Sequence, residues 1–115
     1  MPHLIIQTNL KVSADEQETL LTEASHLTSE SLGKPESYVM VTLTDQKPMA
    51  FAGTTEPSAY LELKSIGLSG AQTKALSSKL CHFMETKLNV PAGRVYIEFA
   101  DAARDMWGWN NQTFA

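Results

Sequence analysis

The sequence predicts an α+β fold in which two βαβ half-repeats form one four-stranded sheet with two helices on one face. Three observations predict it. Apolar residues recur first at strand spacing, then at helix spacing, then at strand spacing, and this order occurs twice. A proline follows each predicted helix, and Pro35 and Pro91 lie 91 − 35 = 56 positions apart. At 115 residues, the chain accommodates a single domain, residues 1–115, with one hydrophobic core.

The first half-repeat begins with a predicted strand at residues 3–8. Ser13, followed three residues later by Glu16, is typical of a capping box that starts a helix. Gly33 favours the left-handed backbone that ends a helix, and residues 38–44 then form a β-branched strand. The helix carries apolar or small residues at helical spacing: Leu20, Leu21, Ala24, Leu27, Thr28, Ser31 and Leu32.

The second half-repeat follows the same order, with a strand at residues 60–66 and a second capping box at Ser69 and Gln72. We expect parallel pairing and a right-handed crossover inside each half. The second helix carries an apolar stripe of Leu76, Leu80, Phe83, Met84 and Leu88. The last strand places three apolar residues on one face: Val95, Ile97 and Phe99.

Two helices cover only one face of a sheet, so we expect the other face to be apolar and the chain to oligomerise. The C-terminal segment, residues 101–115, has no helical stripe and is predicted to form a short strand and a turn. Its aromatic residues Trp107, Trp109 and Phe114 either pack in the core or line a pocket shared with a neighbouring subunit.

Composition excludes several functional classes. A net charge of −4 without a Lys/Arg cluster indicates no nucleic-acid partner. The N-terminal apolar run, residues 4–6, is too short for a signal peptide or a membrane span, so we expect a cytosolic protein that contacts no membrane, or one secreted without a signal peptide. Cys81 is the only cysteine, which excludes an intrachain disulfide. Since His3, His26 and His82 lack metal-ligand spacing, we expect no metal and no cofactor.

Pro2 is the first candidate catalytic residue. If Met1 is removed, Pro2 presents a free secondary amine at the start of a strand. An α-amino group has a pKa of about 7.7 to 8.0 in model peptides, so burial or a nearby cation keeps it neutral at physiological pH. A neutral amine is a general base. The alternative is that Pro2 only precedes an edge strand, where its missing N–H costs nothing.

Short motifs along the whole chain resemble the macrophage migration inhibitory factor family of the tautomerase superfamily. They are Met1-Pro2, Gln7-Thr8-Asn9, Gly33-Lys34-Pro35, Asp45-Gln46, Met49-Ala50-Phe51, Glu56-Pro57, Ser65-Ile66-Gly67, Arg94-Val95-Tyr96-Ile97, Gly108-Trp109-Asn110-Asn111 and Thr113-Phe114-Ala115. The resemblance implies a homotrimer whose three sheets surround an axial channel, with active sites between subunits. It also implies keto–enol tautomerase activity on phenylpyruvate-like and dopachrome-like compounds.

The resemblance also implies roles for individual residues. Pro2 matches the catalytic base, and Tyr96 matches a residue that enters the site from the neighbouring subunit. The substrate-binding wall of the first subunit matches Lys34, Ser65 and Ile66. The aromatic surround matches Tyr38, Trp109 and Phe114.

Three departures from the animal members stand out. Ser58 and Leu61 occupy the positions of their CxxC cysteine pair, so we expect no thiol-oxidoreductase activity. Glu98 replaces an asparagine, and Trp107 replaces a valine. Glu98 and Trp107 belong to the inferred substrate pocket, so we expect an altered substrate range.

Tautomerisation requires a base, a donor to the enolate oxygen and a group that holds the substrate carboxylate. Pro2 fits the first role and the Lys34 ammonium fits the third. The Tyr96 hydroxyl and the Ile66 N–H are candidate donors to the enolate oxygen or to the carboxylate. The alternative for Lys34 is a solvated charge that interacts with the helix dipole.

Glu98 shares a strand face with Tyr96, so both are predicted to enter the same pocket. Its carboxylate would repel an acidic substrate and make the activity weak, unless it turns to solvent or pairs with Lys34 or Arg104. The sequence therefore predicts a weak tautomerase for an enolisable 2-keto acid. The alternative function is a cytokine-like protein that binds a receptor and keeps a vestigial pocket.

Overall fold

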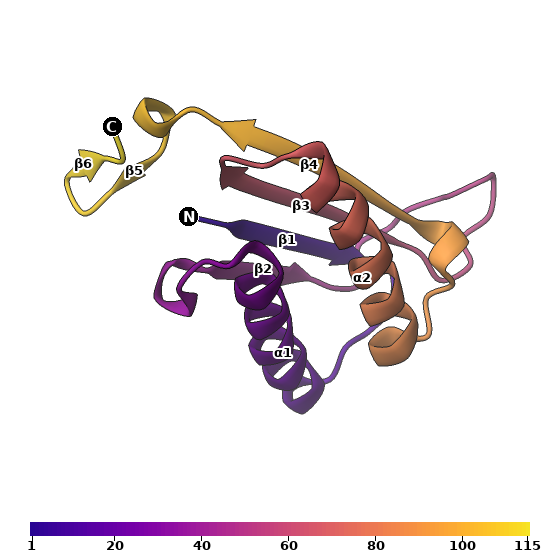
Figure 1. Cartoon of the computed structure of the whole chain (residues 1–115). Helices are drawn as coiled ribbons and strands as arrows, with labels where there is room; N and C mark the ends of the chain where they lie inside the picture. The colour runs from indigo at the N-terminus through magenta and orange to yellow at the C-terminus, as the bar shows by residue number, and fades with distance from the viewer.

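In the computed structural model, which describes residues 1–115, a four-stranded mixed sheet carries two helices on one face (Figure 1). The strands are β1 (His3–Thr8), β2 (Met40–Thr44), β3 (Ala59–Ile66) and β4 (Val95–Ala102), and the helices are α1 (Ala14–Leu32) and α2 (Gly70–Leu88). The strand order is β2-β1-β3-β4. Strand β1 pairs parallel with β2, β3 pairs parallel with β4, and β1 and β3 pair antiparallel in the centre. The two predicted βαβ half-repeats are confirmed.

The helices start and end where the local signals predict. The Ser13 side chain caps α1, and Ser69 with Gln72 forms a complete capping box on α2. Helix α1 ends at Gly33, whose φ of 63° is left-handed. Helix α2 ends in the same way at Asn89, with a φ of 57°, two residues before the proline that marked the predicted end.

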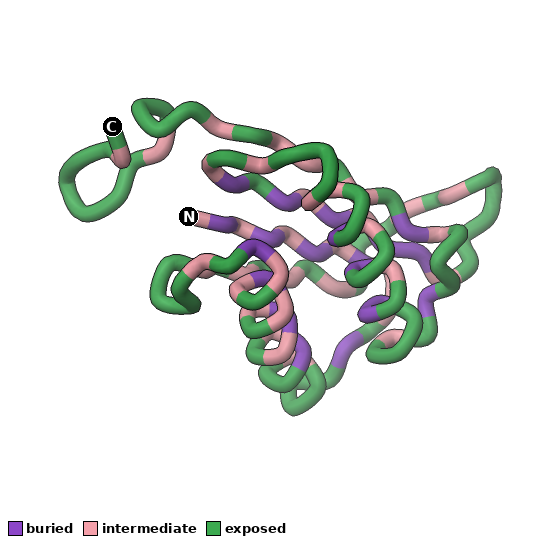
Figure 2. Tube along the Cα trace, in the orientation of Figure 1, coloured by how far each residue is buried: buried purple, intermediate pink, exposed green.

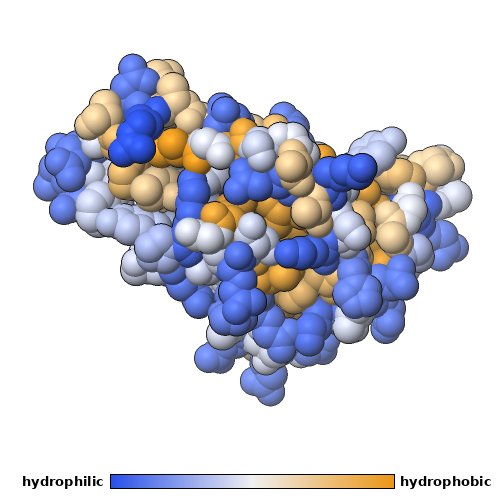
Figure 3. Space-filling model, viewed as in Figure 1, coloured by the Kyte–Doolittle hydropathy of each residue, from blue (hydrophilic) through white to orange (hydrophobic).

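The hydrophobic core lies between the sheet and the helices. Buried residues alternate along β1 and β3 and face the buried sides of α1 and α2 (Figure 2). Between the helices, hydrophobic side chains remain visible at the surface (Figure 3). Each fully buried large aliphatic side chain contributes about 1.5–3 kcal/mol through burial. The core consists of Leu4, Ile6, Leu20, Ala24, Leu32, Ala59, Leu61, Leu63, Leu76, Leu80, Phe83, Met84, Val90 and Val95.

The prediction of a strand over residues 38–44 is wrong at its start. Strand β2 begins at Met40, and Tyr38 lies in a short 3₁₀ helix, η1 (Glu36–Tyr38). The Tyr38 N–H donates to the Pro35 carbonyl at 3.0 Å, and the Val39 N–H donates to the Glu36 carbonyl at 3.0 Å. This turn after the helix removes Tyr38 from the sheet.

The prediction that the open sheet face is apolar is also wrong. Side chains alternate between the two faces along a strand. The apolar side chains of β3 and β4 face the helices, so their charged side chains lie on the open face. The Tyr60 hydroxyl donates to Glu98 Oε2 at 2.7 Å and lies 3.2 Å from Glu62 Oε1. Lys64 Nζ lies 3.5 Å from Glu62 Oε2. The open face therefore gives no hydrophobic argument for a trimer, which remains a prediction from the resemblance.

After β4, the chain continues beyond the edge of the sheet as a 3₁₀ helix, η3 (Arg104–Met106), and a hairpin of β5 (Gly108–Trp109) and β6 (Gln112–Thr113). Asn110 and Asn111 form its turn at φ of 50° and 66°. This exposed tail lies near the N-terminus (Figures 1 and 2). No helix is long and apolar enough to cross a membrane.

Candidate functional site

A cavity of about 460 Å³ lies where the N-terminus, η1 and the C-terminal tail meet. Three parts of the chain that are far apart in sequence therefore form one site. Its lining comprises Met1, Pro2, His3, Ser37, Tyr38, Val39, Met40, Trp107, Gly108, Trp109 and Phe114. Seven of these are hydrophobic, so the cavity suits a ligand with an apolar body.

Pro2 is held firmly in this cavity. Its side chain is fully buried, and its carbonyl accepts the Met40 N–H at 3.0 Å, which ties it to the start of β2. Burial and then the Lys34 charge lower the pKa of the Met1 α-amino group from 8.0 to about 6. The Met1 α-amino group is therefore largely neutral at pH 7.

Lys34 connects the end of α1 with the end of β3. Its Nζ donates to Ser65 Oγ at 3.0 Å and to the Ile66 carbonyl. Burial lowers the pKa of Lys34, while the charge of Asp101 raises it and that of Arg104 lowers it. Two acceptors thus hold the ammonium, unlike a solvated charge at a helix end. The three residues predicted for the binding wall, Lys34, Ser65 and Ile66, are in contact with one another through these hydrogen bonds.

An aromatic cluster forms one side of the cavity. The ring centroids of Tyr38 and Trp109 lie 5.4 Å apart at 70°, and those of Trp109 and Phe114 lie 5.8 Å apart at 13°. Tyr38 and Phe114 meet edge to face at 6.1 Å. Trp107 lines the same cavity. All four predicted aromatic residues therefore line one cavity together with Pro2, and none belongs to the buried core.

Tyr96 and Glu98 lie elsewhere in the protomer. Tyr96 is 66% exposed, lines a separate cavity and packs against Phe51 with ring centroids 4.8 Å apart. The Glu98 carboxylate accepts the Tyr60 hydroxyl, so its partner is neither Lys34 nor Arg104. Within a single chain, the predicted site therefore lacks these two residues.

The sequence reasoning did not predict Ser37, Val39 or Met40 as lining residues. They enter the cavity because the turn after Pro35 brings the η1 segment beside Pro2, and no periodic pattern signals such a turn. His3 lines the cavity too, although its Nε2 lies 3.3 Å from Thr42 Oγ1 on the open face.

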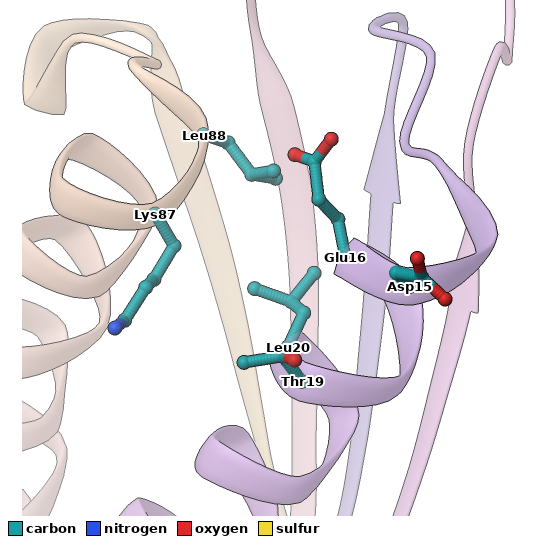
Figure 4. A pocket seen from close by; sticks show the side chains of 6 residues that line it. All are labelled: Asp15, Glu16, Thr19, Leu20, Lys87 and Leu88. Carbon is teal, nitrogen blue, oxygen red and sulfur yellow. The ribbon is translucent and has the colours of Figure 1, made fainter.

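A further cavity, of about 290 Å³, lies between the start of α1 and the end of α2 (Figure 4). Two of its polar side chains already have partners within the helices or their caps: Lys87 Nζ lies 2.6 Å from Glu23 Oε2, and Glu16 Oε1 accepts the Ser13 hydroxyl. No group of three His, Cys, Asp or Glu side chains converges anywhere in the chain as a metal site would require. The Pro2 cavity is therefore the candidate functional site. The lining of the α1–α2 cavity is Asp15, Glu16, Thr19, Leu20, Lys87 and Leu88.

Comparisons with known proteins agree along the whole chain. A family model described as macrophage migration inhibitory factor (MIF) matches residues 1–115. The macrophage migration inhibitory factor of Xenopus tropicalis is 38% identical over 117 residues, and that of Rattus norvegicus is 36% identical over 116 residues. Each alignment covers 100% of both proteins.

Solved structures give the same result for the fold. A homologue of macrophage migration inhibitory factor from Prochlorococcus marinus has a TM-score of 0.93 and 45% identity, covering 98% of this chain and 99% of that chain. The protein from Trichinella spiralis has a TM-score of 0.90 and 35% identity, covering 96% and 98%. The α+β arrangement of four strands and two helices is the arrangement of these proteins.

Proposed function

Because the chain belongs to the macrophage migration inhibitory factor family, we propose that it is a keto–enol tautomerase for small enolisable 2-keto acids, such as phenylpyruvate, and for dopachrome-like compounds. Removal of Met1 frees the Pro2 amine, which acts as the general base. The main support is the placement of Pro2, which is buried in an apolar cavity next to Met1. Burial and Lys34 lower the pKa of the Met1 α-amino group to about 6, and we expect the freed Pro2 amine to be affected in the same direction.

In this proposal, Lys34 binds the substrate carboxylate. An ammonium has three N–H donors, and Ser65 and Ile66 accept two of them, which leaves one for the substrate. The aromatic cluster packs against the body of the substrate. Pro2 then takes a proton from the carbon beside the keto group, and the resulting enolate oxygen receives that proton to give the enol. General-base catalysis of this kind contributes about 10²–10⁴-fold to the rate.

The developing enolate oxygen needs hydrogen-bond donors. The Ile66 N–H and the Tyr96 hydroxyl of a neighbouring subunit supply them in this proposal. No cofactor is needed, because proton transfer between two atoms of the substrate leaves its oxidation state unchanged.

Since Tyr96 and Pro2 lie apart within one chain, the complete site requires a second subunit, and we propose a homotrimer. Multi-angle light scattering is expected to give about three times the chain mass of 12.7 kDa. A mass of 12.7 kDa at micromolar concentration would contradict both the trimer and the shared site.

The pH dependence of kcat/KM for phenylpyruvate tests the state of the base. The Pro2 amine acts only when deprotonated, and we expect its pKa to be lowered like that of the Met1 α-amino group, which is about 6. On this basis kcat/KM is expected to rise with pH through an acidic limb near pH 6 and to level off near pH 7. Ultraviolet absorbance at pH 5 to 8 measures this. A limb near pH 8 would show that the pKa of the base is not lowered.

The function itself is tested with phenylpyruvate and a dopachrome ester, using protein whose intact mass shows that Met1 is absent. A folded trimer without turnover of either compound would refute the tautomerase and favour a cytokine-like protein that binds a receptor. Protein that retains Met1 serves as a control, because its Pro2 nitrogen is an amide and takes no proton.

Glu98 is expected to restrain this activity. On β4 it faces the same side as Tyr96, so its carboxylate enters the neighbouring site if Tyr96 does, and there it repels the substrate and favours protonated Pro2. Glu98→Gln is therefore expected to lower the pKa of the acidic limb and to raise kcat/KM for phenylpyruvate. Glu62→Gln, on the neighbouring strand, is the matched control. An unchanged limb and rate in the Glu98 variant would show that its charge does not reach the site.

A further inference from the structure

Arg104 is fastened beside the Pro2 cavity. Its Nε donates to the Phe114 carbonyl at 2.8 Å, and the Phe114 N–H donates back to the Arg104 carbonyl at 3.1 Å. Phe114 is part of the cavity lining. The two terminal nitrogens of the Arg104 guanidinium have no hydrogen-bond or ion-pair partner in the structure. A positioned cation thus stands next to the aromatic cluster with free donors.

The charges around Arg104 favour an anion. Lys34 also has no ion pair, and Arg104 lies close enough for its charge to lower the Lys34 pKa, after the larger effect of burial. Asp101 opposes this effect, but its Oδ1 already accepts the Gly67 and Leu68 N–H groups at 2.8 and 3.1 Å. Asp105, the next residue, makes no contact with the guanidinium. Lys34 and Arg104 thus place two positive charges without carboxylate partners near one cavity, although the whole chain has a net charge of −4.

The two cations differ in what they offer a ligand. The Lys34 ammonium is directed by Ser65 and Ile66 and has a single free donor. The Arg104 guanidinium keeps its terminal N–H groups, whose planar fork suits a carboxylate. The Phe114 carbonyl accepts Arg104 Nε, and the Phe114 ring stacks with Trp109, so the guanidinium adjoins the aromatic cluster.

We propose that Arg104 binds a second carboxylate of the ligand, so that this site selects dianionic 2-keto acids with one carboxylate on Lys34 and a distal carboxylate on Arg104. The reaction of such a ligand rests on the proposed tautomerase function, whereas its binding does not. The competing role for Arg104 is to hold the tail through Phe114 alone. Arg104→Gln separates the two roles, because glutamine keeps an N–H donor for the Phe114 carbonyl and loses the charge.

Binding can be followed without turnover, because the only two tryptophans of the chain, Trp107 and Trp109, both line the cavity. Quenching of their fluorescence gives Kd for cinnamate and for 4-carboxycinnamate, which differ by one carboxylate. At low salt, the wild type is expected to bind 4-carboxycinnamate about fivefold more tightly, a modest factor because Arg104 is exposed. Added salt is expected to weaken the binding of 4-carboxycinnamate, the dianion, more than the binding of cinnamate, the monoanion.

The preference is expected to vanish in Arg104→Gln and to persist in Arg104→Lys. Lys79→Gln removes the same charge at an exposed position of α2, and this variant is expected to retain the preference for 4-carboxycinnamate. The proposal is overturned if the wild type shows no preference, if Arg104→Gln retains it, or if salt affects both ligands equally. The salt comparison uses only wild-type protein, so it can still overturn the proposal if a variant misfolds. If the protein does not turn over phenylpyruvate, the proposed tautomerase function is refuted. The Kd values still test whether Arg104 binds the second carboxylate.

Discussion

Replacing Pro2 with glycine is expected to lower kcat for phenylpyruvate by about 10²-fold, the lower end of the range for general-base catalysis. Glycine retains an α-amino group after Met1 is removed, but this amine is primary and no longer fixed by a ring. The fold is expected to persist, because the contact of residue 2 with Met40 uses its backbone carbonyl.

Ultraviolet absorbance measures this loss, and circular dichroism with light scattering verifies the fold and the assembly. Intact mass must show that Met1 is absent from both proteins. Pro91→Gly, the same change at an exposed position after α2, is the matched control and is expected to leave kcat unchanged. An unchanged kcat in Pro2→Gly would assign the base to another group.

Replacing Lys34 with glutamine is expected to lower kcat/KM for phenylpyruvate by about 10- to 100-fold, mainly through a higher KM. The ammonium is the group proposed to bind the carboxylate, and its hydrogen bonds to Ser65 and Ile66 hold it at the end of β3. A second effect has a definite sign. The Lys34 charge lowers the pKa of the amine in the cavity, so its removal is expected to move the acidic limb to higher pH.

The methyl ester of phenylpyruvate separates binding of the carboxylate from other effects of Lys34. The ester has no charge to bind, so its kcat/KM at pH 8, above the limb, is expected to change by less than about threefold in Lys34→Gln. Lys79→Gln is again the control for net charge. Equal losses with the acid and the ester would contradict the role assigned to Lys34.

The fold was predictable to the extent that local interactions determine it. The capping residues Ser13 and Ser69 and the left-handed Gly33 act within a few positions of the chain, so the sequence locates both helices. Period-two alternation likewise locates β3 and β4, and the short apolar run of residues 4–6 locates β1. The error over the open face had a signal in the sequence, because Glu62, Lys64 and Glu98 occupy the alternate positions that face away from the helices.

The site was predictable from the resemblance but not from local patterns. Lys34 and Ser65 are 31 positions apart and meet only because β3 lies next to β1 in the order β2-β1-β3-β4. The turn that moves Tyr38 from the strand into the cavity depends on backbone contacts with Pro35 and Glu36, which periodicity does not reveal.

The sequence by itself determined the elements, their amphipathic faces and the candidacy of Pro2, because these follow from the chemistry and spacing of neighbouring residues. Only the tertiary structure decided that the C-terminal tail and the N-terminus line one cavity, that Tyr96 lies outside this cavity in its own chain, and that Arg104 lies beside Phe114 with free donors. These features depend on how distant segments pack, and the free energy of such packing is shared among many contacts that no short motif encodes.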